Sequence, residues 1–356
     1  MHEELLLGGI IMSKNAGNAV ITKAKAIYGN RLVAENYEEL LKLKSVSDIV
    51  SYLKRNNKFS NTLSNVDEYS IHRGQLENLI RKSYFDNLTR LVKFVSTPDR
   101  KFYELDMIRR EIEIILSSIR SIISGDIESS IRDLPLFFKK HASIDIEEIT
   151  KSLTMQKLLN ELHDTRYYDI IYPFYTEDKT EIKYADIEHS LYSQYHRIVI
   201  QRINKYYKGK NHDTLMDMYQ SKVEIENVIK IYRLKKFYNA SESDIMNTII
   251  LDNIRMSKRK LIELINTKEP DDILKVLSKS DLSQFKDDDG YVYIEYQAEK
   301  IKYNLAKRFM YYSTFPPLIY SALLFLNDIE RTNLFNIIEG IRYDIDKDEI
   351  KKMIIY

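Results

Sequence analysis

Two short patterns occur three times along this chain, in the same order and with nearly constant spacing. The first pattern contains Glu77, Glu188 and Glu295, and the second contains Glu111, Glu224 and Glu330. The two patterns are separated by 34, 36 and 35 residues in the three copies. Because one short match arises easily by chance but three ordered matches do not, the chain is predicted to contain one structural unit in triplicate.

The apolar residues favour helices throughout. Ile108, Ile112, Ile115, Ile119 and Ile122 recur at steps of three and four, which places them on one helical face. The chain has nine Gly and six Pro, and this Gly content is roughly half the usual frequency. Since sheets need many tight turns, an all-α fold is expected. A separation of about 35 residues fits one long helix, a short turn and half of the next helix.

The expected organisation is three diverged helical bundles after a short extension. The extension covers residues 1–20, and the copies cover 21–130, 131–240 and 241–356. A third pattern, Leu53 with Phe59, resembles Leu162 with Tyr168, and its weaker partner is Leu277 with Phe285. Three copies that reuse one interface can form a pseudo-threefold ring or funnel. Met12 is an alternative start to the chain.

The charge balance argues against nucleic-acid binding, and the cysteine content excludes several kinds of site. Lys and Arg number 54 and Asp and Glu 53, without the basic excess typical of proteins that bind nucleic acid. There is no Cys, so disulfides, thiolate zinc sites and a Cys nucleophile are excluded. No apolar run approaches the roughly 18 residues of a membrane span.

The recurring glutamates are interpreted as structural. Glu111 and Glu113 lie two apart on a predicted helix and do not face each other, so they are poor partners in a carboxylate site. With Asn227 and Asn333, which follow the second glutamate in copies two and three, the recurring glutamates form a repeat signature. No catalytic residue, metal or cofactor is predicted. In the Lys-rich stretch 205–210, Gly209 is expected to cap a solvated helix end.

Two alternatives are kept open. The dipeptide His163-Asp164 is similar to one found in helical metal-dependent phosphohydrolases, although no other His completes a pattern. The second alternative is a helical repeat protein that binds nucleic acid.

The two ends of the chain resemble one family. The closing run comprises Phe315-Pro316-Pro317-Leu318-Ile319-Tyr320, Ala322-Leu323-Leu324-Phe325-Leu326 and Glu330-Arg331-Thr332-Asn333-Leu334, with Ile337 and Gly340. The opening run comprises Ala24-Lys25-Ala26-Ile27-Tyr28-Gly29-Asn30-Arg31-Leu32 and Tyr37-Glu38-Glu39-Leu40-Leu41. These runs look like those of one component of V-type and A-type ATPases, the C subunit of prokaryotes and the d subunit of eukaryotes. The likeness covers about residues 20 to 350. Phe335, Ile341 and Ile114 depart from the family pattern, so specific polar contacts at those positions are not expected.

The resemblance implies a function that composition does not supply. Members of this family are non-catalytic parts of a rotary ATPase, and form a helical socket on the cytoplasmic face of the membrane proteolipid ring. The socket receives the foot of the central axle, made of the D and F subunits, and passes torque into the ring for H⁺ or Na⁺ transport or ATP synthesis. One copy per complex, without a membrane span of its own, is expected.

Overall fold

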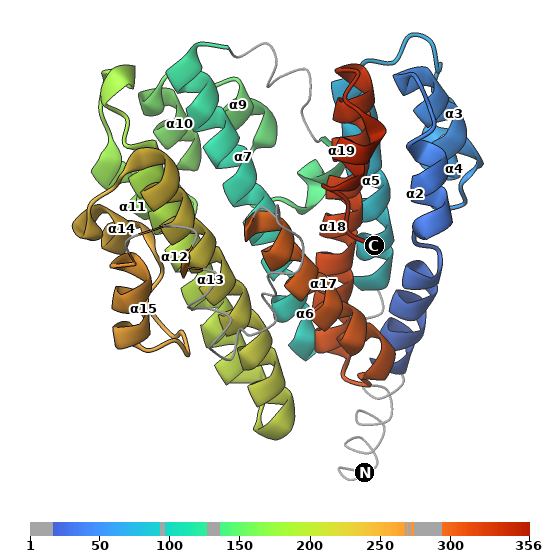
Figure 1. Ribbon diagram of the computed structural model, residues 1–356. Coiled ribbons are helices and arrows are strands. Elements are labelled where there is room, and N and C mark those ends of the chain that lie inside the picture. Colours follow the sequence, from blue (N-terminus) through green and yellow to red (C-terminus); the bar gives the residue numbers. More distant parts are fainter. Residues whose placement is uncertain (1–16, 93–96, 127–135, 268, 270–271, 274–293) are drawn as a thin grey trace, which may run out of the picture.

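The computed structural model describes residues 17–92, 97–126, 136–267, 269, 272–273 and 294–356. All regular secondary structure in these residues is helical, without any strand among them, which confirms the all-α prediction (Figure 1). None of the helices in the described part of the chain combines the length and apolar character needed to cross a bilayer. The extension proposed for residues 1–20 lies mostly outside the described residues.

Long helices pair along the chain as hairpins. The first comprises α5 (Arg73–Val92), α6 (Thr97–Tyr103) and α7 (Leu105–Ser124), which follow one another in the sequence, although α5 packs mainly on α4 and α18 and not on α7. In the second, α12 (Tyr184–Tyr206) packs on α13 (Gly209–Tyr238), and in the third, α17 (Ile294–Tyr312) packs on α18 (Pro316–Arg342). Helix α18 begins at Pro316, a favourable position because proline at the first helical residue lacks only an N–H that would have no partner.

The predicted cap at Gly209 is wrong. Helix α12 ends at Tyr206, and Tyr207 and Lys208 are extended. Gly209, with a φ of 58°, is instead the first residue of α13. The connection uses the left-handed freedom of Gly to begin a helix, not to end one.

The hairpins contact one another in cyclic order. Helix α7 packs on α12, α13 packs on α17, and α18 packs on α5. The second long helix of each hairpin therefore contacts the first long helix of another, and the last of these contacts joins opposite ends of the sequence.

Short helices cover the outside of the long ones. Those on α7 and α12 are η1 (Leu136–His141), α9 (Ile146–Thr150), α10 (Met155–Leu162), α11 (Tyr168–Ile171), η2 (Tyr172–Phe174) and η3 (Lys179–Glu181). Those associated with α13 are α14 (Glu242–Thr248) and α15 (Lys258–Ile265). Those on α5 and α18 are α2 (Ala34–Leu40), α3 (Val46–Arg55), α4 (Ser60–Leu63) and α19 (Lys347–Lys351).

One short helix has the same design in each bundle. The hydroxyls of Ser45, Thr154 and Ser257 accept the backbone N–H three residues later and so cap α3, α10 and α15. The residue four positions after each cap, Ile49, Leu158 or Leu261, is buried. Leu277 and Phe285, which the sequence suggested as the third copy of this pattern, lie outside the described residues.

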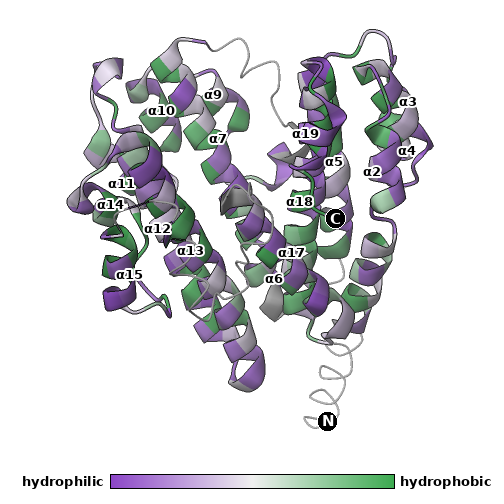
Figure 2. Cartoon of the chain, viewed as in Figure 1, coloured by the Kyte–Doolittle hydropathy of each residue, from purple (hydrophilic) through white to green (hydrophobic). Residues whose placement is uncertain are grey.

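Apolar residues fill the space between the layers. The helical residues 17–29 insert Val20, Ala24 and Tyr28 against α5 and α18, in a cluster with Leu91 and Leu323. Figure 2 shows hydrophobic residues concentrated where helices face one another, with polar residues on their outer sides. This pattern is that of amphipathic helices packed around a shared core.

Candidate functional site: buried carboxylates and a cation-lined cavity

Glu111 and Glu224 anchor the segments that follow their helices. Glu111 accepts hydrogen bonds from the backbone N–H of Ser143 and from the Ser143 hydroxyl at 3.0 Å. Glu224 accepts backbone N–H bonds from Arg255 at 2.6 Å and from Met256 at 2.8 Å. The amide of Ser143 is 32 residues beyond its glutamate, and those of Arg255 and Met256 are 31 and 32 beyond theirs. Equivalent glutamates thus make equivalent contacts in the first two copies.

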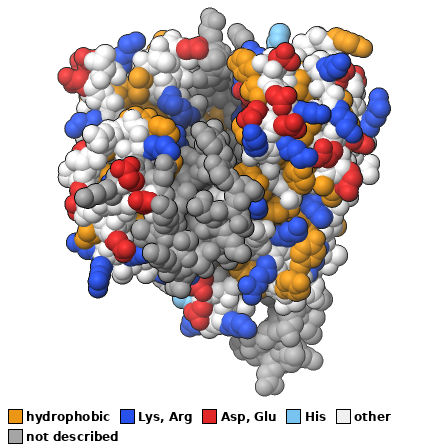
Figure 3. Space-filling model, viewed as in Figure 1, with side chains coloured by type: hydrophobic (Ala, Val, Ile, Leu, Met, Phe, Trp, Pro, Cys, Tyr) orange, Lys and Arg blue, Asp and Glu red, His pale blue; other side chains and the backbone are white. Residues whose placement is uncertain are grey.

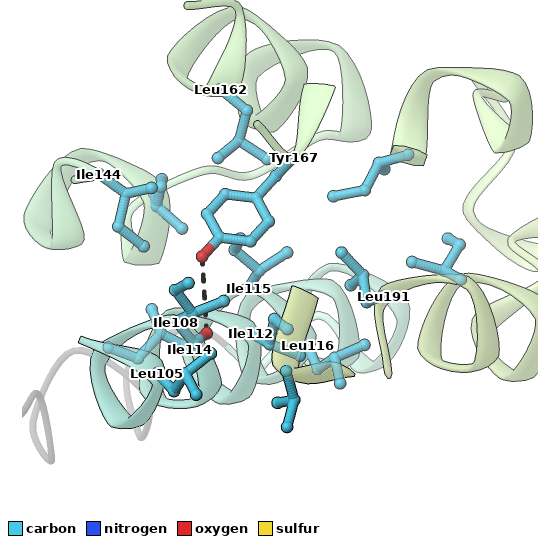
Figure 4. Close-up of a cluster of buried hydrophobic side chains, with 14 of the residues drawn as sticks. Leu105, Ile108, Ile112, Ile114, Ile115, Leu116, Ile144, Leu162, Tyr167 and Leu191 are labelled. Carbon is cyan, nitrogen blue, oxygen red and sulfur yellow. Dashed lines mark hydrogen bonds between the residues drawn. The ribbon is translucent and has the colours of Figure 1, made fainter. Parts of the chain in front are cut away.

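Tyr167 completes the contacts of Glu111. Its hydroxyl donates to the carboxylate at 2.5 Å and lies 3.5 Å from the Ile108 carbonyl. Figure 4 shows the ring between Leu162 and helix α7, with the hydroxyl directed at the α7 backbone. Burial and the neighbouring Glu111 carboxylate raise the pKa of Tyr167 far above its usual range, so it stays a neutral donor.

Glu330 is bonded by residues from the first part of the chain and not by a segment that follows its helix. Its carboxylate binds instead the ammonium of Lys58 at 2.7 Å and the hydroxyl of Tyr84 at 2.9 Å. Lys58 follows Leu53 by five residues, as Tyr167 follows Leu162. The N-terminal part of the chain therefore supplies to the third glutamate what a later segment supplies to the first.

Asn227 and Asn333 make the same two-point contact. The side-chain amide of Asn227 donates to the Ile250 carbonyl at 2.7 Å and accepts from the Ile250 N–H at 2.9 Å. Asn333 binds Ile355 in the same way, at 2.6 and 3.0 Å. In the first copy the equivalent residue is Ile114, which is buried as part of the apolar core.

The glutamates of the first pattern are less alike. Glu77 is buried and paired with Arg73 at 2.6 Å and Arg81 at 3.5 Å on its own helix. Glu188 is half-buried on α12. Glu295 lies in α17, and its side chain is outside the description.

A charged cluster joins the three second-pattern helices. Its members Arg109, Lys222 and Asp328 each lie two residues before the signature glutamate. Arg109 bonds Asp328 at 2.9 Å, and the half-buried Lys222 lies close enough to both for their charges to act on it. Burial alone would raise the pKa of Asp328, but Arg109 and Arg331 overcome it and lower the pKa to about 2. Burial lowers the pKa of Lys222. The sequence contained one signal for this cluster, since its three members lie at the same offset from the signature glutamates. That offset acquires a meaning only when the three helices are seen to lie together.

A cavity of about 780 Å³ lies between α5, α6, α7 and α12. Arg100, Lys140, His141, Arg166 and Arg202 line it. The carboxylates on its wall have partners of their own: Glu104 pairs with Lys101, Asp106 with Arg110, and Glu111 with Ser143 and Tyr167. The cations of this cavity can therefore bind an anionic group of a partner, and the surrounding groups provide rigidity.

The His163-Asp164 pair is an exposed surface contact. The ring nitrogen Nδ1 lies 3.1 Å from the Asp164 carboxylate, and the side chains are 68% and 99% exposed. Within the described residues no three His, Asp or Glu side chains are grouped as metal ligands. The structure therefore gives the phosphohydrolase alternative no specific support.

Comparison with known proteins identifies the family. Residues 20–353 match the model of the ATP synthase (C/AC39) subunit. The chain is also 23% identical, over 248 residues, to the C subunit of the A-type ATP synthase of Methanosarcina mazei, an alignment that covers 68% of this chain and 66% of that relative. The likeness of the opening and closing runs is confirmed by these matches. Because the match spans nearly the whole described body, the chain belongs to the ATP synthase (C/AC39) subunit family of V-type and A-type ATPases.

Proposed function

We propose that this protein is a non-catalytic central-stalk subunit of a rotary V/A-type ATPase. It would form the socket that couples the axle, made of the D and F subunits, to the membrane proteolipid ring. One copy would sit on the cytoplasmic face of the ring and serve ATP-driven H⁺ or Na⁺ transport or ATP synthesis. The observation that carries this proposal beyond family membership is the cyclic packing of three hairpins, fastened by buried carboxylates.

We propose further that the three hairpins form a pseudo-threefold funnel, with copies over residues 21–130, 131–240 and 241–356. Three observations support this arrangement: the α7–α12, α13–α17 and α18–α5 contacts, the matching bonds of Glu111 and Glu224, and the meeting of Arg109, Lys222 and Asp328. In this arrangement the third bundle needs both ends of the chain, since Lys58 binds Glu330.

The physics of the fold suits a part that transmits torque. A coupler must resist twisting, so it gains from long helices whose relative positions are fixed by buried, directional bonds. The double bonds of Asn227 and Asn333 and the carboxylate bonds of Glu111 and Glu224 are of this kind. The cation-lined cavity offers anionic side chains of a partner a place to bind.

Purification of the intact complex tests the proposal. A tagged copy of this protein should retain both the axle subunits and the proteolipid ring in mild detergent. Complexes that lack it should hydrolyse ATP in the detached head without driving ion transport. If a complex assembled without this protein still couples hydrolysis to transport, the proposal is wrong.

A further inference from the structure

The turns of the hairpins meet at one end of the molecule. The ring of Tyr207, in the α12–α13 turn, lies 5.5 Å from Phe102 of α6 and 5.4 Å from Phe315 of the α17–α18 turn. A methyl group at Gly17 would lie 3.2 Å from Pro316, so the first described residue reaches the same end. We call the described residues 17–28, 100–104, 202–213 and 305–315 the tip face.

The tip face is strongly basic in a nearly neutral protein. The net charge of the chain is +1. In the tip face, however, Lys and Arg far outnumber the carboxylates, which are Glu104 and Asp213. Glu104 pairs with Lys101 and Asp213 with His212. The exposed cations Arg100, Lys205, Lys208, Lys210 and Arg308 are left without an ion pair to a carboxylate in the described part of the chain. Figure 3 shows Lys and Arg side chains, together with a few Asp or Glu, in the lower part of the visible face, where Figure 1 places the α12–α13 and α17–α18 turns.

Exposed tyrosines accompany these cations. At the end of α17, Tyr311 is 51% and Tyr312 is 84% exposed. A tyrosine has an apolar ring and a polar hydroxyl, and such side chains are favoured at the boundary between a bilayer and water. At the surface of a bilayer with anionic lipids, such cations meet the phosphates while rings beside them enter the headgroup layer.

We propose that the tip face binds anionic phospholipid headgroups, with Lys208, Lys210 and Arg308 against the phosphates and Tyr311 and Tyr312 in the headgroup layer. This orientation rests on the proposed function, since it directs the tip face toward the membrane that holds the ring. The cations of the tip face attract a surface of negative potential from within about one Debye length. The opposite end of the molecule then faces the axle.

Vesicle binding by the full chain tests this inference. The protein should float with vesicles of phosphatidylcholine and phosphatidylglycerol, and not with phosphatidylcholine alone. Replacing Lys208→Glu, Lys210→Glu and Arg308→Glu together should weaken the partition coefficient by at least about a hundred-fold at low salt, from roughly five-fold for each cation. The matched control Lys42→Glu, Lys44→Glu and Lys183→Glu changes exposed cations elsewhere by the same charge and should retain binding.

Three outcomes overturn the inference. One is equal binding to neutral and anionic vesicles. Another is that a protein starting at Met12 loses vesicle binding while the variant with Lys208→Glu, Lys210→Glu and Arg308→Glu, the tip variant, retains it. That result would assign binding to the apolar stretch 5–11. The third is absence of vesicle binding while the tip variant loses the proteolipid ring in detergent, which would point to an acidic protein partner. Failure of vesicle binding with full retention of the ring and coupling leaves the proposed function standing.

Discussion

Single buried side chains fix segments of this protein that lie far from them in the sequence. Asn333 fixes Ile355, next to the C-terminus, through both halves of its amide. The substitution Asn333→Asp keeps the shape but replaces the donor with a carboxylate oxygen against the Ile355 carbonyl. We expect it to lower the free energy of unfolding by roughly 2–4 kcal/mol, measured by urea denaturation. Asn336→Asp, one turn later at a more exposed 3.2 Å bond to Met353, is the matched control and should cost under about 1 kcal/mol.

Buried histidines make stability depend on pH. Burial lowers the pKa of His196 and of His189 below their ordinary value, while the carbonyls of Asp252 and Thr248 act to raise it. Because the unfolded chain binds these protons more readily, the stabilisation is complete above about pH 6.5 and is lost as the pH falls below it. The thermal midpoint should therefore drop between about pH 7 and pH 5. His196→Gln should flatten this slope, and His196→Gln with His189→Gln should flatten it further; an unchanged slope in the double variant would contradict the assignment.

Sequence patterns identified some of these residues and missed others, for a physical reason. Glu111, Glu224, Asn227 and Asn333 were found because the short patterns that contain them recur at nearly constant spacing. Lys58 was missed because its partner Glu330 is 272 residues away, so no local pattern connects them. The use of Asn227 and Asn333 as backbone clamps could not be predicted either, since an amide in a helix gives no indication of which distant N–H and C=O it meets.

At the scale of elements, the N-terminal short helices are tied to the last long helix. The side chains of Lys58 and Glu330 are only 2% and 8% exposed, so each charge depends on the other. Lys58→Met would leave the carboxylate buried with Tyr84 as its donor, and should lower the free energy of unfolding by about 3–5 kcal/mol. Adding Glu330→Gln removes the remaining charge and should restore a large part of the loss. A double-mutant cycle in urea checks this, and strictly additive single effects would rule out the coupling.

Long helices were predictable and their connections were not. The stripe of isoleucines in α7 is a local signal of an amphipathic helix, and this prediction is confirmed. The prolines that open α18 are likewise a local signal of a helix start. Gly209 was placed at the wrong helix end because a left-handed glycine fits either side of a short turn. The capped helix α15 was missed, although Ser257 and Leu261 repeat the spacing of Thr154 and Leu158, because its lysine-rich first turn hid the apolar pattern.

At the scale of the whole molecule, the offset of Arg109, Lys222 and Asp328 from the signature glutamates links repetition in sequence to contact in space. In the proposed pseudo-threefold arrangement, equivalent positions of the three copies would meet near the axis that relates the copies. Two cations and one carboxylate meet here, with Glu226 3.8 Å from Lys222 to offset the second cation. Three identical charged residues at these positions would repel one another. The centre can hold charges because the residue types at the three positions differ.

A charge exchange tests whether this centre holds the hairpins together. Arg109→Asp places two carboxylates where a 2.9 Å ion pair now joins α7 to α18, and Asp328→Arg places two guanidinium groups there. Each single change should destabilise the protein by roughly 1–3 kcal/mol, because it leaves like charges together in a half-buried site. The double exchange restores opposite charges, although Asp106 and Arg331 then face a like charge, so recovery should be partial. The exposed pair Lys352 and Glu349 is the control, since its exchange should change little.

If the centre also transmits torque, the single variants should reduce ion transport per ATP hydrolysed in the assembled complex, and the double exchange should return it toward the wild-type ratio. Equal stability of the single and double variants would show that the three helices are held by their apolar faces alone.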